Sequence, residues 1–151
     1  MTAKLFIDTN LLVYAYDISE PEKRIQATNL LNDITDNNLG AISTQVLIEF
    51  VNAVTRKIPS PLSPADAYTQ VEEMVRVWTV LELRAPIVVE AVRGMRDYGF
   101  SIWDAQIWAT ARLNGISLVL SDDFNNGAQI EGVRFLNPFV SGFDTKAVIQ
   151  N

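Results

Sequence analysis

Short apolar segments rich in β-branched residues alternate along this chain with longer, helix-compatible segments. Five apolar segments are predicted to be strands, at residues 4–7, 40–42, 78–83, 116–120 and 133–136. They are short and rich in β-branched residues and do not alternate regularly in polarity, as in parallel strands buried on both faces of a sheet. The alternation therefore predicts an α/β fold: a three-layer α/β/α sandwich with a central parallel sheet of about five strands.

The segments between the strands carry helical apolar spacing and residues that commonly begin or end helices. Helices are predicted at residues 11–16, 21–36, 43–57, 64–77, 86–98 and 101–113. Ser63 is expected to cap the fourth helix, with Pro64 at its first position. The tail after Pro138 is less clearly patterned, and we predict no element there.

The length of 151 residues is that of one domain with its own core, so we expect a single domain over residues 1–151. No run of about 18 apolar residues exists, which predicts no membrane span. The first ten residues lack the apolar stretch of a signal peptide. The absence of cysteine suits a reducing compartment, so we expect a cytoplasmic protein.

The amino-acid composition restricts the chemistry available to this chain. It has no histidine and no cysteine, which excludes imidazole bases, thiolate nucleophiles, His/Cys zinc sites and a Ser-His-Asp triad. The net charge of −6 argues against tight, non-specific DNA binding. It argues less against a nuclease, because clustered carboxylates raise the negative count and a bound cation reverses the local sign.

Acidic residues stand at four separate places where they can meet in a folded chain. These are Asp8, Glu49, Asp104 and the pair Asp122–Asp123. Asp8 and the pair directly follow predicted strands, and ligands of parallel sheets bind at the carboxyl ends of strands. Converging carboxylates repel one another unless a hard divalent cation binds them. The pattern therefore favours a metal-dependent enzyme.

Asp8 and Glu49 each have a structural alternative. Asp8, Thr9 and Asn10 all suit the N-cap of a helix. In the functional interpretation, Asp8 points into the ligand crevice, and Thr9 and Asn10 add a hydroxyl and an amide. Glu49 lies mid-helix, where the alternative is an ordinary solvated face.

Asp104 and the acidic pair also allow two interpretations. Asp104 stands three residues after Ser101, in a spacing that resembles a helix cap. Its apolar neighbours nevertheless make an unpaired carboxylate costly. In the pair, Asp123 is predicted to face the crevice on the same side as Ser121, by strand alternation, with Asp122 as the alternative.

Four motifs together resemble a known family. They are FIDTNLLVYAYD, STQVLIEFVN, YGFSIWDAQIWATARLNG and LVLSDDFNNG, in this order along residues 4–140. In order and spacing they resemble PIN-domain ribonucleases, and most of all the VapC-type toxins of toxin–antitoxin pairs. The resemblance implies an α/β/α sandwich around a parallel sheet, an RNA substrate such as tRNA, a cognate antitoxin protein and a homodimer.

The same resemblance implies roles for individual residues. A metal-binding and catalytic cluster for Mg²⁺ or Mn²⁺ would consist of Asp8, Glu49, Asp104 and Asp123. Asn10 and Ser121 match the polar helpers of the family. The doubled acid is a departure that leaves Asp122 as an alternative fourth ligand. Candidate phosphate contacts are Arg56, Arg93, Arg96 and Arg112, although such surface arginines are commonly plain solubilising charges.

These observations predict a metal-dependent endoribonuclease that hydrolyses RNA phosphodiester bonds, the toxin of a type II toxin–antitoxin system. The alternatives are a housekeeping or RNA-processing PIN nuclease and a catalytically silent PIN-fold binding module. A phosphatase with Asp8 as nucleophile is less favoured, because position 10 is Asn10 and not a second acid. A dinucleotide-binding role is disfavoured, because no G-x-G-x-x-G follows a strand.

Overall fold

The computed structural model describes residues 5–150, whose central feature is one six-stranded sheet of strand order β3-β2-β1-β4-β6-β5. The strands are β1 (Leu5–Ile7), β2 (Gly40–Ser43), β3 (Thr79–Leu81), β4 (Leu118–Leu120), β5 (Gln129–Ile130) and β6 (Val133–Leu136). Strands β3, β2, β1, β4 and β6 are parallel to one another, and β5 adds an antiparallel edge next to β6.

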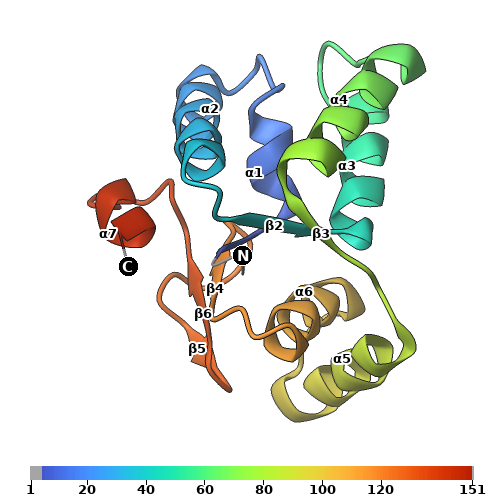
Figure 1. The fold of residues 1–151 in the computed structure, drawn as a ribbon, viewed down its shortest axis with the longest axis vertical. Coiled ribbons are helices and arrows are strands. Elements are labelled where there is room, and N and C mark those ends of the chain that lie inside the picture. The colour runs from blue at the N-terminus through green and yellow to red at the C-terminus, as the bar shows by residue number, and fades with distance from the viewer. Residues whose placement is uncertain (1–4, 151) are drawn as a thin grey trace.

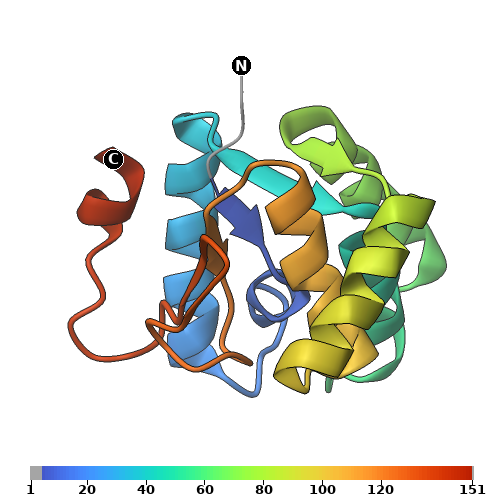
Figure 2. The same cartoon turned by 90° about the horizontal axis from the view of Figure 1, so that it is seen from below.

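Helices cover both faces of this sheet. They are α1 (Thr9–Tyr14), α2 (Pro21–Asp36), α3 (Thr44–Arg56), α4 (Pro64–Val77), α5 (Ala85–Tyr98), α6 (Ile102–Leu113) and α7 (Thr145–Gln150). Figures 1 and 2 show α1 to α4 on one side of the sheet and α5 with α6 on the other. The predicted three-layer α/β/α sandwich is thereby confirmed.

Two elements were not predicted. The sheet has six strands where about five parallel strands were expected, because β5 adds an antiparallel edge of only two residues. The turn between β5 and β6 contains Glu131 at φ 47° and Gly132 at φ 82°, the left-handed backbone that a tight hairpin requires. Helix α7 forms in the tail after Pro138, where the sequence shows no clear helical pattern.

The predicted starts of α3 and α6 agree with the capping residues observed, whereas α1 begins at Thr9, two residues before its predicted start. Ser43 Oγ accepts from the backbone N–H of Val46 at 3.1 Å, and Ser101 Oγ accepts from that of Asp104 at 3.2 Å. Each bond satisfies a backbone donor that the first turn of a helix leaves unpaired. Within residues 5–150, no helix combines the length and the apolar character needed to cross a membrane.

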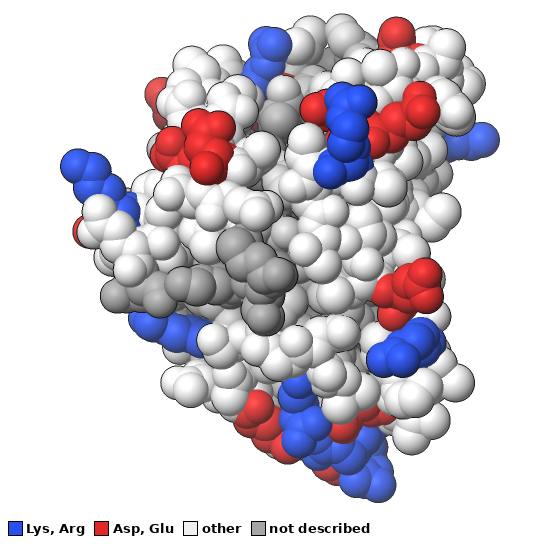
Figure 3. All heavy atoms as spheres, viewed as in Figure 1, with Lys and Arg blue, Asp and Glu red and all other residues white. Residues whose placement is uncertain are grey.

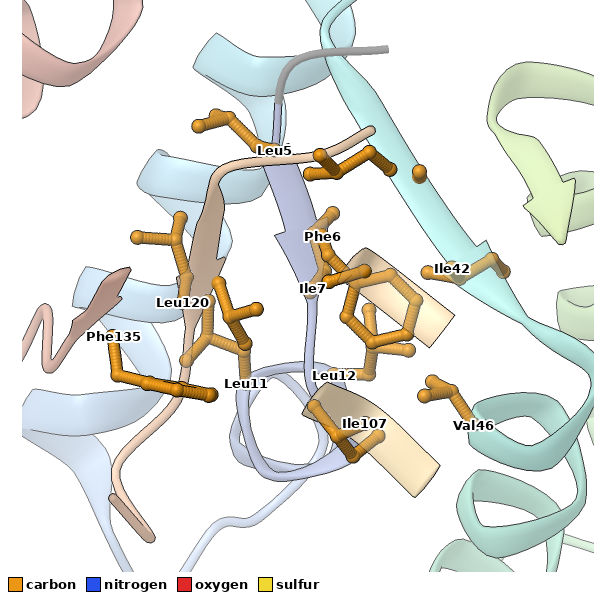
Figure 4. Close-up of a cluster of buried hydrophobic side chains, with 14 of the residues drawn as sticks. Leu5, Phe6, Ile7, Leu11, Leu12, Ile42, Val46, Ile107, Leu120 and Phe135 are labelled. Carbon is orange, nitrogen blue, oxygen red and sulfur yellow. The ribbon is translucent and has the colours of Figure 1, made fainter. Parts of the chain in front are cut away.

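The core lies on both faces of the central strands. All three residues of β1 are buried, and so are Val119 and Leu120 of β4. Figure 4 shows the side chains of β1 and of Leu120 meeting those of α1, α3 and α6 in one cluster. Burial on both faces explains why these segments are continuously apolar.

Close packing of α5 on α6 fixes the position of α6. A Cβ atom at Gly94 would lie 2.8 Å from a ring carbon of Trp108, so only glycine permits this approach. The Trp108 indole is fully buried, and its Nε1–H donates to the carbonyl oxygen of Ile130 at 3.1 Å. Helix α6, which carries Asp104 in its first turn, is therefore held against both α5 and the β5–β6 hairpin.

Candidate active site

The chain topology creates a crevice at the carboxyl ends of β1 and β4. These strands are parallel neighbours, with Ile7 paired to Leu120. From β1 the chain moves through β2 to β3, and α5 and α6 then return it across the other face to β4 (Figure 1). The strand order therefore reverses between β1 and β4, which is where open α/β sheets bind ligands. Asp8 follows β1 and Ser121 follows β4.

Asp8 is held at the end of β1 by several hydrogen bonds. The residue is 4% exposed. Oδ1 accepts from the backbone N–H of Thr9 at 2.7 Å, and Oδ2 accepts from Ser121 Oγ at 2.7 Å and from Asn10 Nδ2 at 3.5 Å. Asp8 thus caps α1 and also faces β4, so the two interpretations of this residue are compatible.

Glu49 on α3 is tied to the same crevice from the other side. Its carboxylate accepts from Thr9 Oγ1 at 2.9 Å and from Gln45 Nε2 at 3.1 Å. Gln45 Nε2 also donates to the carbonyl oxygen of Trp103 at 3.3 Å. Gln45 therefore links the face of α3 that carries Glu49 to the residue that precedes Asp104.

The two acids after β4 point to different partners. The Asp122 carboxylate accepts from the Tyr14 hydroxyl at 2.8 Å and lies 3.9 Å from Lys23 Nζ. The backbone N–H of Asp123 donates to Ser121 Oγ at 3.1 Å, which places this residue beside the Asp8–Ser121 pair. Asp122 is therefore bound to α1 and α2, while Asp123 lines the crevice.

The carboxylates influence one another electrostatically. Burial raises the pKa of Asp8 to about 7, although hydrogen bonds from Ser121 and Thr9 lower it, and the charges of Asp123 and Glu49 raise it further. Desolvation also raises the pKa of Asp104, again with the charges of Asp123 and Glu49. The pKa of Asp123 is raised by desolvation first and also by the charge of Glu49. The four predicted acids therefore belong to one electrostatic group.

The donors present suit a hard divalent cation in type, since they are carboxylate, hydroxyl and amide oxygens. Across residues 5–150, no three acidic side chains stand close enough to ligate one ion together. Mg²⁺ usually binds one or two carboxylates and keeps several waters, so a complete protein cage is not required. Gln45 Oε1 is a buried oxygen for which the described part of the chain provides no hydrogen-bond partner.

An open cleft of about 890 Å³ extends from the acids along α3. Its lining includes Thr9, Asn10, Val13, Ile48, Glu49, Asn52, Lys57, Ile58, Trp103 and Asp123. Trp103 and Lys57 are among the lining residues that were not singled out from the sequence. The sequence signal that could have indicated Trp103 is its position directly before Asp104, in the first turn of a predicted helix.

Three of the four candidate arginines are engaged by carboxylates. Arg93 pairs with Glu131 at 2.8 Å, and Arg112 pairs with Glu90 at 3.0 Å. Arg96 pairs with Asp97 at 2.7 Å. Figure 3 shows basic and acidic side chains mixed over the lower end of the molecule, where α5 lies in Figure 1. These arginines join α5, α6 and the β5–β6 turn and do not line the cleft.

The family model of the PIN domain matches residues 5–126, which is most of the chain. The chain belongs to the PIN-domain family. The matched part runs from β1 to the loop after β4, and it includes all four acids of the electrostatic group. No curated protein matches this PIN domain in sequence.

Solved structures share the fold of this PIN domain. A toxin–antitoxin complex from Klebsiella pneumoniae has 18% identity and a TM-score of 0.66, covering 89% of this chain and 98% of that one. The Mycobacterium tuberculosis toxin VapC20, which cleaves the sarcin–ricin loop, has 20% identity and a TM-score of 0.66, with 86% and 98% covered. The DNA-bound VapBC of Salmonella typhimurium has 18% identity and a TM-score of 0.65, with 91% and 99% covered.

We expect the metal-free PIN domain to become less stable as the pH rises from about 4 to about 7. The folded protein keeps Asp8 protonated up to about pH 7, whereas this carboxyl in the unfolded chain ionises near 3.8. In this window the folded state holds the additional proton, so its stability falls by up to about 1.4 kcal/mol per pH unit. Outside the window both states bind the same number of protons at this group, and its contribution is constant.

Thermal unfolding in EDTA at a series of pH values between about 5 and 8 tests this sign. The Asp8→Asn variant is the control, because it lacks the titrating group and retains nearly the same shape. Its advantage in melting temperature over the wild type should grow as the pH rises to about 7. A constant difference across the series would show that Asp8 ionises normally in the fold.

Proposed function

We propose that residues 1–151 act as one PIN-domain nuclease, a metal-dependent endoribonuclease that hydrolyses RNA phosphodiester bonds. The observation that carries this proposal is the meeting of acids from β1, α3, α6 and the loop after β4 in one electrostatic group. Glu49 and Asp123 line an open cleft, and Asp8 lies at the point where the strand order reverses. Burial raises the pKa values of Asp8, Asp104 and Asp123, and the charges of neighbouring carboxylates raise them further, as is common at functional sites.

In this proposal, Asp8 and Asp104 are the central ligands of Mg²⁺ or Mn²⁺. Glu49 and Asp123 complete the site, either as ligands of a second ion or by holding coordinated water. A cation bound here would acidify and orient a nucleophilic water and neutralise charge on the phosphate. The contacts of Asp122 with Tyr14 and Lys23 support Asp123 as the fourth acid.

The neighbouring polar side chains have supporting roles in the proposal. Ser121 and Asn10 hold one oxygen of Asp8, and the backbone N–H of Thr9 holds the other. The Thr9 hydroxyl orients Glu49. These bonds fix the directions of two carboxylates before substrate arrives, which reduces the reorganisation required during the reaction. A water nucleophile needs no 2′-hydroxyl, so we expect a 5′-phosphate and a 3′-hydroxyl as products.

A toxin of a type II toxin–antitoxin system is the biological role that we propose. Its support is the fold shared with VapC20 and with toxin–antitoxin complexes. A cognate antitoxin, a homodimer and a cytoplasmic location belong to the same proposal. A housekeeping or RNA-processing PIN nuclease is the alternative that keeps the same chemistry, and a silent binding module is the alternative without it.

The proposal predicts cleavage of RNA that requires a divalent cation. A panel of end-labelled RNAs that includes tRNAs would be incubated with purified protein in Mg²⁺, Mn²⁺ or EDTA. We expect fragments with 5′-phosphate ends in Mg²⁺ or Mn²⁺ and intact RNA in EDTA. Products with a 2′,3′-cyclic phosphate, or equal cleavage in EDTA, would contradict the mechanism. Folded protein that cuts no RNA of the panel would favour the binding module.

A further inference from the structure

Trp103 occupies an unusual position for a tryptophan. It lies in the first turn of α6, directly before Asp104, and is 61% exposed although it lines the cleft that contains the acids. Trp108, one helical turn and one residue further along α6, is fully buried. A large apolar ring left open to solvent within a cleft provides a surface for a ligand.

The backbone of Trp103 is linked to the acidic group. Its carbonyl oxygen lies 3.3 Å from Gln45 Nε2, and the same nitrogen lies 3.1 Å from a Glu49 oxygen. These bonds hold the backbone of Trp103, and so the point from which its indole extends, at a fixed position relative to Glu49. Ile48, which is 72% exposed, adds apolar surface to the same cleft.

A positive charge lies further along the cleft. Lys57 follows Glu49 by eight residues on α3 and its C-cap, which is about 12 Å along the helix axis. Its side chain is exposed, and no acidic side chain within residues 5–150 forms a salt bridge with it. The cleft thus offers an aromatic face and a separate cation, in addition to its carboxylates.

We propose that Trp103 holds the base next to the scissile phosphate by stacking, while Lys57 contacts a phosphate of the same strand further along α3. This inference rests on the proposed ribonuclease function and assigns two substrate-positioning residues to it. Every base has a π-face, so stacking on an indole requires an unpaired base and tolerates different sequences. A base inside a duplex already stacks on its neighbours and cannot use this surface.

Tryptophan fluorescence tests the proposal through binding. The Asp8→Asn variant would be titrated in Mg²⁺ with a short unpaired RNA and with a duplex of the same sequence. We expect unpaired RNA to quench the emission, and we expect no quenching in a variant that also carries Trp103→Phe. In that background, Trp103→Leu or Trp103→Ala should weaken binding roughly 5- to 150-fold, and Trp103→Phe much less. Ile48→Ala is the matched control, because it removes apolar surface from the same cleft but no π-face. We expect it to leave the quenching in place and to weaken binding much less than Trp103→Ala.

Cleavage kinetics and salt dependence supply the second measurement. Trp103→Ala in the otherwise wild-type chain should raise KM by a similar factor, with a smaller effect on kcat. Lys57→Ala should weaken binding about equally for all sequences and reduce the slope of log affinity against log salt by about one.

Three outcomes would overturn the inference. The first is an emission that does not respond to RNA; if the wild type then cuts RNA, the nuclease proposal stands without Trp103. The second is equal quenching by unpaired and duplex RNA. The third is an emission that changes with protein concentration and not with RNA, which would assign the indole to a contact between copies of the chain.

Discussion

Replacing Asp8 with asparagine should lower the rate of metal-dependent RNA cleavage at least about 100-fold, because even partners outside the first ligand shell typically contribute 10- to 100-fold. The carboxylate is buried at the end of β1 and receives bonds from Ser121 and Thr9. Asparagine keeps the size of the side chain and removes the negative charge that a cation requires.

The same substitution should stabilise the metal-free protein, by roughly 1–3 kcal/mol near pH 7, since it removes a buried ionisable group. Cleavage rates and urea unfolding in EDTA measure the two effects on one sample. Asp36→Asn at the exposed end of α2 is the control for the same chemical change. Loss of both activity and stability would indicate a structural role for Asp8, and unchanged cleavage would remove Asp8 from the site.

Trp108→Ala should reduce the free energy of unfolding by about 3–5 kcal/mol. The indole is fully buried between α5 and the β5–β6 hairpin and packs edge-on against Tyr98 with ring centroids 5.6 Å apart. Its removal leaves a cavity beside Gly94 and leaves the carbonyl of Ile130 without its donor. The loss is a large fraction of the stability of an ordinary domain.

Urea denaturation checks this expectation, and the chain provides its own control. Trp103→Ala makes the same chemical change five residues earlier in α6, at a side chain that is 61% exposed. We expect this variant to remain within about 0.5 kcal/mol of the wild type. Similar losses in the two variants would show that Trp103 packs into the fold and is not open to a ligand.

The elements that could be predicted have a local cause. The prediction of Ser101 as a helix cap and of a mainly apolar strand at 116–120 depends on neighbours within a few residues. The structure contains this cap, and a shorter strand at Leu118–Leu120. Strand β5 was missed because its two residues have no pattern of their own. Strand β5 forms because it pairs with β6 across the turn at Glu131 and Gly132. A pairing between two segments cannot be predicted from the spacing of apolar residues within either one.

The acidic site shows the same division. Each acid had an ordinary alternative when taken alone, and Asp8 in fact performs the capping role as well, through its bond from Thr9. The different surroundings of Asp122 and Asp123 depend on where Tyr14 and Lys23 lie, because both contact Asp122, and this is a matter of how α1 and α2 pack beside β4.

The sequence by itself determined the α/β class, the positions of most helices and strands, and the kinds of side chain available for chemistry, because these follow from local periodicity and composition. Only the tertiary structure decided which acids share one electrostatic group, which arginines are occupied by carboxylates, and that Trp103 stands exposed in the cleft. These properties depend on distances between residues far apart in the chain, which exist only once the strands pair and the helices pack.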